Sequence, residues 1–143
     1  MHKTKPEQTS LNMNISQAAR ISGLSTKMIR HYEQIGLLNH VQRSSAGYRE
    51  FSDHDIQMLG FIRQARVLGF PIEQIRALLE LWQDPQRSSH AVKEVATEHL
   101  SQVEEKLQEL QAMKRTLEQM IRACADNDQP HCAILDGLAP RAP

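Results

Sequence analysis

Two cysteines, Cys124 and Cys132, are the only thiols of the chain, and they enclose the polar stretch ADNDQPH. The Asp, Asn and Pro residues between them predict a loop. Thiols at the two ends of such a loop can converge on one point. The polar first twelve residues lack a secretory signal, so we expect a cytoplasmic protein in which a structural disulfide does not form. The pair is therefore a metal site, a redox switch or two inert thiols.

The number of soft ligands bears on which metal the thiols would hold. Two thiolates satisfy a monovalent ion such as Cu(I), whereas structural Zn(II) takes four nitrogen or sulfur ligands. Asp126, Asp128 and His131 lie close enough in sequence to complete a divalent site, and His90 or His99 could join from a partner chain. A redox role lacks the C-x-x-C spacing, and the two aspartates are expected to raise the thiol pKa. The residues favour a monovalent ion without settling the choice.

The cysteines follow a long helical pattern, which we place at residues 92–123 after a linker at 83–91. Its apolar residues recur every three or four positions: Val92, Ala96, Leu100, Val103, Leu107, Leu110, Met113, Leu117 and then Met120 or Ile121. The domain of about seventy residues that precedes this helix is too small to cover a stripe of this length. A second copy of the chain is the simplest partner, and an intramolecular helical hairpin is the alternative. Residues 124–143 then form the loop, a short lid helix and a tail.

Residues 13–82 predict a small helical domain, the head, behind a disordered tail at 1–12. We expect four helices, at 17–21, 27–34, 55–68 and 71–82. Ser16 is expected to cap the first, Ser25 or Thr26 the second, and Ser52 or Asp53 the third. Pro71 is expected to be the first residue of the fourth. Two short helices joined by a turn with Gly23 are typical of a helix-turn-helix. Residues 41–51 predict a β-hairpin, the wing, whose turn holds Gly47.

Basic residues gather in this head although the formal net charge of the chain is zero. Residues 13–49 hold five Lys or Arg and one acidic residue, Glu33. On the second helix Lys27, Arg30, His31 and Tyr32 are expected to project outward. On the wing Arg43, Tyr48 and Arg49 can reach phosphates. The distribution therefore indicates a nucleic-acid partner at the N-terminal end.

Several stretches resemble a known family. NISQAARISGLSTKMIRHYEQIGLL, RSSAGYREF and FIRQARVLGFPIEQI closely resemble the DNA-binding head of MerR-family transcriptional regulators. DPQRSSHAVK and the C-x7-C loop resemble the copper-responsive, CueR-like branch of that family. The resemblance implies a mainly α fold: a winged helix-turn-helix head, an antiparallel coiled-coil dimerisation helix and a C-terminal metal-binding loop. It also implies DNA contacts through Lys27, Arg30, Tyr32, Arg43, Tyr48 and Arg49.

The same resemblance implies a function. One Cu(I), Ag(I) or Au(I) ion would bind Cys124 and Cys132, and Ser89 stands where divalent-metal sensors carry a third cysteine, although a serine there also suits a helix cap. A homodimer would bind double-stranded operator DNA and activate metal-efflux genes by distorting the promoter for RNA polymerase. We expect no enzymatic activity and no membrane segment. A divalent-metal sensor, in which His131 joins the thiols, and a thiol-redox regulator are the alternatives.

Overall fold

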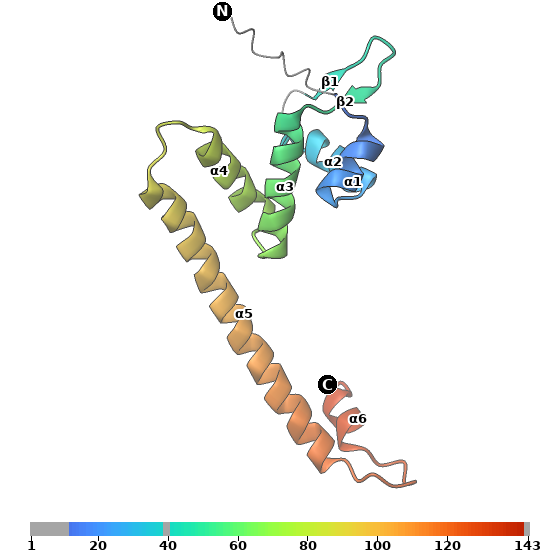
Figure 1. Ribbon diagram of the computed structural model, residues 1–143. Helices are drawn as coiled ribbons and strands as arrows, with labels where there is room; N and C mark the ends of the chain where they lie inside the picture. The colour runs from blue at the N-terminus through green and yellow to red at the C-terminus, as the bar shows by residue number, and fades with distance from the viewer. Residues whose placement is uncertain (1–11, 39–40, 142–143) are drawn as a thin grey trace, which may run out of the picture. The chain divides into compact units, whose positions relative to one another are not determined.

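The computed structural model describes residues 12–38 and 41–141, which form six helices and a two-stranded hairpin (Figure 1). The elements are α1 (Ile15–Ser22), α2 (Thr26–Gln34), β1 (Gln42–Arg43), β2 (Arg49–Glu50), α3 (Asp53–Val67), α4 (Ile72–Gln83), α5 (Ser89–Ala123) and α6 (Ala133–Leu138). The mainly α fold with a small wing is thereby confirmed. The chain divides into two compact units, Met1–Val95 and Ala96–Pro143, each described by itself below.

Side-chain caps fix the starts of the helices in the first unit. The Ser25 hydroxyl accepts a hydrogen bond from the Met28 amide, and Ser52 caps α3 in the same way, as predicted. The prediction that Ser16 caps α1 is wrong. Asn14 is the cap, because its side chain accepts from the Gln17 amide while its own amide donates to the Gln17 side chain. Pro71 is the N-cap of α4 rather than its first residue.

The core of the first unit forms where α1 packs against α2 and α3, and α3 against α4. Its largest fully buried side chains are Tyr32, Phe51, Ile29, Leu59, Ile62 and Ile75. The expectation that Tyr32 projects outward from α2 is therefore wrong. Tyr32 follows Ile29 by three residues, which places both side chains on the same, buried face of the helix. Trp82 stacks on Phe61 at the edge of this core and stays 37% exposed.

The wing is joined to the start of α1. Its strands pair antiparallel, with Arg43 opposite Arg49, and its turn contains Gly47 at φ 85°. Met13 forms an isolated bridge with Phe51: each backbone amide donates to the carbonyl of the other residue, at 2.9 and 2.7 Å. The expected disordered tail lies outside the described residues except for Asn12, whose side chain donates to Glu50. The wing and the first turn of α1 are thus fixed against each other.

Helix α5 begins three residues earlier than predicted. Its first turn is capped by Ser88, whose hydroxyl accepts a hydrogen bond from the Ala91 amide, and Ser89 is the first helical residue. The apolar stripe is exposed in the single chain: Leu100, Val103, Leu107, Leu110, Met113, Leu117 and Ile121 are 44–62% accessible. None of the described helices is both long and apolar enough to cross a membrane.

Candidate nucleic-acid interface and metal centre

A groove of about 420 Å³ lies in the first unit between the start of α1, helix α2 and the wing. Its lining residues are Asn14, Ile15, Arg30, Arg43, Gly47, Tyr48 and Arg49. Four of the six predicted DNA contacts therefore meet in one place. The start of a helix presents free backbone N–H groups and the positive end of the helix dipole, and both favour phosphate. Three guanidinium groups beside that helix end make the groove a suitable phosphate-binding surface.

The two remaining predicted contacts are outside the lining of this groove. Lys27 is exposed in the first turn of α2 and is free to reach a ligand from there. Tyr32 is fully buried beneath Arg66, whose guanidinium carbon lies 6.0 Å from the ring centroid. A side chain with no exposed surface does not contact DNA in this conformation, so the assignment of Tyr32 to the DNA-binding set is corrected. Among the described residues its hydroxyl has no hydrogen-bond partner.

Glu33 is a site residue that sequence reasoning missed. Its carboxylate accepts a hydrogen bond from Arg49 Nε at 2.5 Å and lies 3.6 Å from a terminal nitrogen of Arg43. The three side chains are partly exposed, at 21% for Glu33, 27% for Arg49 and 50% for Arg43. The only signal in the sequence is that Glu33 is the single acidic residue among five basic ones between residues 13 and 49.

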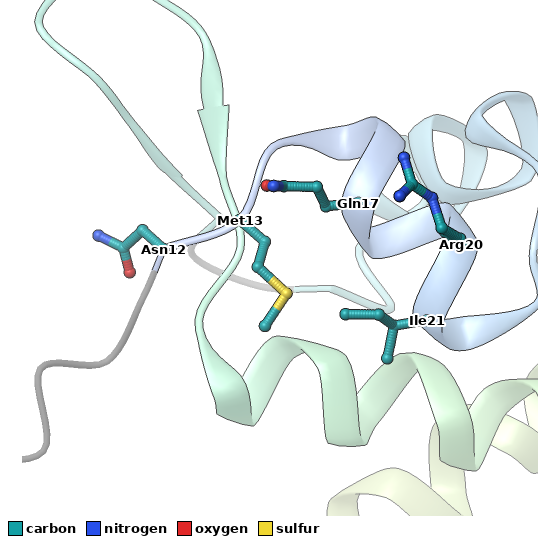
Figure 2. A pocket seen from close by; sticks show the side chains of 5 residues that line it. All are labelled: Asn12, Met13, Gln17, Arg20 and Ile21. Atoms are coloured by element: carbon teal, nitrogen blue, oxygen red, sulfur yellow. The ribbon is translucent and has the colours of Figure 1, made fainter.

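A second hollow, of about 370 Å³, lies on the other side of the α1 N-terminus. It is lined by Asn12, Met13, Gln17, Arg20 and Ile21, and Figure 2 shows the Met13 and Ile21 side chains extending over α3 while Arg20 points away. It holds one cation and none of the predicted site residues. The groove beside the wing is therefore the stronger candidate for the nucleic-acid interface.

The two thiols meet in the second unit. Cys124 lies one residue beyond α5 and Cys132 is the N-cap of α6, and their sulfur atoms are 3.3 Å apart. That distance is well above the roughly 2.05 Å of a disulfide. One ion with metal–sulfur bonds of about 2.3 Å spans sulfurs up to about 4.6 Å apart. The thiols thus converge, as their spacing predicts, and a small separation of the two sulfurs would admit a single soft ion.

The two thiols differ in acidity. The pKa of Cys124 is raised, chiefly by its hydrogen bond with Cys132, then by burial and by negative charge on Cys132 and Asp126. The pKa of Cys132 is lowered, chiefly because the Leu135 amide stabilises its thiolate, with help from Cys124 and the Ile134 amide. The expectation that the acidic loop raises the pKa of both thiols is thus wrong for Cys132. Backbone donors at the start of α6 outweigh the nearby carboxylates.

Two of the histidines considered as further ligands contact carboxylates in the single chain. His131 Nδ1 lies 3.5 Å from Asp136, and His90 Nε2 lies 2.9 Å from Glu94. Within residues 12–38 and 41–141, no group of three or more His, Cys, Asp or Glu side chains converges as metal ligands do. The described chain thus offers two convergent sulfurs, which suits an ion that accepts two soft ligands.

Comparison with known proteins shows the family of the chain. Residues 13–82 match the family described as "MerR HTH family regulatory protein", and residues 56–120 match "MerR, DNA binding". "Heavy metal-dependent transcription regulator 2" of Rhizobium meliloti is 46% identical over 89% of this chain and 86% of its own length. "HTH-type transcriptional regulator CueR" of Escherichia coli is 39% identical over 89% of this chain and 94% of its own.

A solved structure extends the comparison to the fold. The transcription regulator PbrR691 from Ralstonia metallidurans CH34, in complex with lead(II), superposes with a TM-score of 0.76 and 31% identity. The match covers 89% of this chain and 99% of that one.

Proposed function

Because this chain belongs to the MerR family of helix-turn-helix regulatory proteins, we propose that it is a metal-responsive transcriptional activator. Its ion binds at Cys124 and Cys132, and its head binds operator DNA. The observation that carries the proposal is the 3.3 Å approach of two sulfurs whose neighbours supply no third soft ligand in the described chain. The relatives are transcriptional regulators, and the protein is not an enzyme.

DNA binding is assigned to the groove beside the wing. Arg30, Arg43 and Arg49 donate to phosphate oxygens there, and the exposed Tyr48 hydroxyl adds a further donor. Lys27 reaches the backbone from the first turn of α2. Such contacts position the head on the duplex and make its affinity strongly dependent on salt.

The active form is a homodimer joined through α5. The stripe from Leu100 to Ile121 is about half exposed in one chain, and a second copy covers it with an identical stripe. Two heads held by such a dimer bind operator half-sites on one face of the duplex, one or more helical turns apart. One head with a small positive excess does not hold DNA tightly, so dimerisation is required for operator binding.

The ion proposed for the thiol pair is Cu(I), with Ag(I) or Au(I) able to replace it. Soft monovalent ions bind thiolates strongly and do so with few ligands. Cys132, with its lowered pKa, presents the first thiolate, and Cys124 loses its proton as the ion binds. Ser89 has a hydroxyl at the position where a third thiol would favour divalent ions. Helix capping does not account for Ser89, because Ser88 caps α5.

Metal binding acts by changing the shape of bound DNA. Cys124 and Cys132 would hold the ion, and their shared bonding to it would order the loop between them and bias the geometry of the two heads. Both forms of the dimer bind the operator, and the metal-bound form distorts the promoter so that RNA polymerase can use it. A bias of a few kcal/mol between two existing states is sufficient.

Titration with Cu(I), Zn(II) and Pb(II) in reducing buffer tests this function. We expect one Cu(I) per chain, a thiolate-to-metal absorbance band, and transcription from the target promoter that rises with Cu(I). Footprinting should show operator protection with and without the metal. Cu(I) that releases the protein from the operator would refute distortion and favour derepression. Cys124→Ser should abolish the response while leaving protection unchanged.

A divalent-metal sensor is the second candidate, and the lead(II) complex of the structurally similar PbrR691 favours it. Here His131 would turn from Asp136 towards the thiols, or a partner chain would contribute a ligand. A His131→Gln variant separates the two candidates. Loss of the Cu(I) response in that variant, or a stronger promoter response to Pb(II) than to Cu(I), would replace the monovalent assignment.

A further inference from the structure

The carboxylate of Glu33 stands between the two arginines of the wing. Arg43 and Arg49 are direct partners across the β1–β2 hairpin. Like charges at opposed positions of a hairpin repel each other. One oxygen of Glu33 accepts from Arg49 Nε, and the other lies 3.6 Å from Arg43. Glu33 belongs to α2, so a single side chain both offsets part of the charge of the two arginines and ties the wing to α2.

Pairing with Glu33 leaves the arginines able to bind DNA. Arg49 uses Nε for the carboxylate, and its two terminal nitrogens retain N–H donors. Arg43 is half exposed and donates to the Gly47 carbonyl at 3.2 Å, which also limits its rotamers. Both guanidinium groups line the phosphate groove in this paired state. A DNA phosphate can therefore bind to arginines that Glu33 already holds in place.

We infer that Glu33 is a specificity-determining positioning residue, which makes the wing reject duplexes that do not follow the backbone path of the operator. A duplex that places a phosphate where the paired arginines already point binds without breaking any contact. A duplex with its phosphates elsewhere has to pull Arg49 or Arg43 away from Glu33. Its phosphates then face a carboxylate that has lost its partner, and the two negative charges repel each other. The wing thus reads the position of the phosphates, which depends on DNA shape. This inference rests on the proposed assignment of Arg43 and Arg49 to DNA.

The test compares Glu33→Gln with wild type in the full-length dimer. The probes are a duplex selected from a random library on the wild-type protein and a scrambled duplex of equal length and composition. We expect Glu33→Gln to bind the scrambled duplex roughly tenfold more tightly, with a salt slope steeper by about 1.8 for one more phosphate per head. The ratio of selected to scrambled affinity should fall at least fivefold.

Glu50→Gln is the matched control. Glu50 lies beside Arg49 on the same strand, and its carboxylate accepts from Asn12 at 3.1 Å, so the variant removes an equal charge close to the groove. Its affinity ratio should stay within twofold of wild type. An equal effect of Glu33→Gln and Glu50→Gln would overturn the inference, because it would reduce Glu33 to a general negative charge. An equal loss of affinity for both duplexes would also overturn it, since that result indicates damage to the fold.

Glu33→Asp provides a second variant should Glu33→Gln not fold, as judged by its circular dichroism and melting. The aspartate keeps the charge but shortens the reach by one methylene, so it should lower the affinity ratio with no change in net charge. An unchanged ratio in Glu33→Asp would then refute the inference. A wild-type protein that prefers no duplex over the scrambled one would instead refute the proposed DNA-binding function.

Discussion

The two tyrosines of the head, Tyr32 and Tyr48, are expected to differ in their roles: Tyr32 affects the stability of the fold, and Tyr48 affects operator binding. Tyr32 is fully buried with an unpartnered hydroxyl among the described residues, and Tyr48 is 74% exposed at the groove. Tyr32→Phe removes a buried hydroxyl without changing the shape of the side chain. A buried hydroxyl that lacks a partner destabilises a fold by about 1–3 kcal/mol. The free energy of unfolding should therefore rise by about 1 kcal/mol in Tyr32→Phe, and operator affinity should stay within twofold.

The matched variant Tyr48→Phe should behave in the opposite way. Its hydroxyl faces solvent, so the free energy of unfolding should change by less than about 0.5 kcal/mol. A hydrogen bond to a charged phosphate contributes about 1.5–3 kcal/mol, and 1.4 kcal/mol corresponds to about tenfold in affinity. Tyr48→Phe should thus weaken operator binding about tenfold or more.

Urea unfolding and operator titration together measure this pair of effects. The three proteins need equal chain concentrations, because the stability of a dimer depends on concentration. A shift in the urea midpoint with an unchanged slope identifies a change in stability. Tyr32→Phe that loses more than 1 kcal/mol would mean that its hydroxyl is hydrogen-bonded in solution. A tenfold loss of operator affinity in the same variant would return Tyr32 to the DNA-binding set.

Three further predictions concern the second unit and the metal. Leu107→Asp should raise the dissociation constant of the dimer at least about 100-fold, because an uncompensated charge in an apolar interface is strongly unfavourable. Sedimentation would reveal monomers of this variant. Gln108→Asp, which lies off the apolar stripe, should remain a dimer. Iodoacetamide at neutral pH should modify Cys132 before Cys124, because the pKa of Cys132 is lowered and its thiolate therefore forms at lower pH. Equal rates of modification, measured by peptide mass spectrometry, would contradict this order. Ser89→Cys should increase the promoter response to Zn(II) or Pb(II) relative to Cu(I), and an unchanged ratio of responses would remove residue 89 from the selectivity-determining set.

Local signals in the sequence predicted much of the head. Ser25 and Ser52 cap the helices expected of them, since a serine before an apolar helical pattern satisfies free amides whatever the tertiary context. The start of α1 was misplaced because two side chains compete for it. Asn14 forms a reciprocal pair with Gln17, and Ser16 lies two residues too late to do so.

The candidate sites were less predictable because they depend on rotation about helices and on contacts between elements. Tyr32 could have been placed in the core from its three-residue spacing to Ile29, but its position beside Arg30 in a basic helix suggested exposure. The pairing of Glu33 with the wing depends on how the hairpin folds back over α2, which no local pattern encodes. The convergence of the thiols followed from their spacing, whereas their different acidity depends on the amides of α6.

The bridge between Met13 and Phe51 has a practical consequence for the design of shortened versions of the protein. Truncation to a first residue at Met13 would turn the amide that donates to the Phe51 carbonyl into a charged ammonium group. It would also delete Asn12, the hydrogen-bond donor to Glu50. The new charge would lie at the base of the wing, beside the start of α1. A tag-free version that begins there would therefore differ from the full chain in its attraction to DNA, and comparisons of operator affinity should retain at least one residue ahead of Met13.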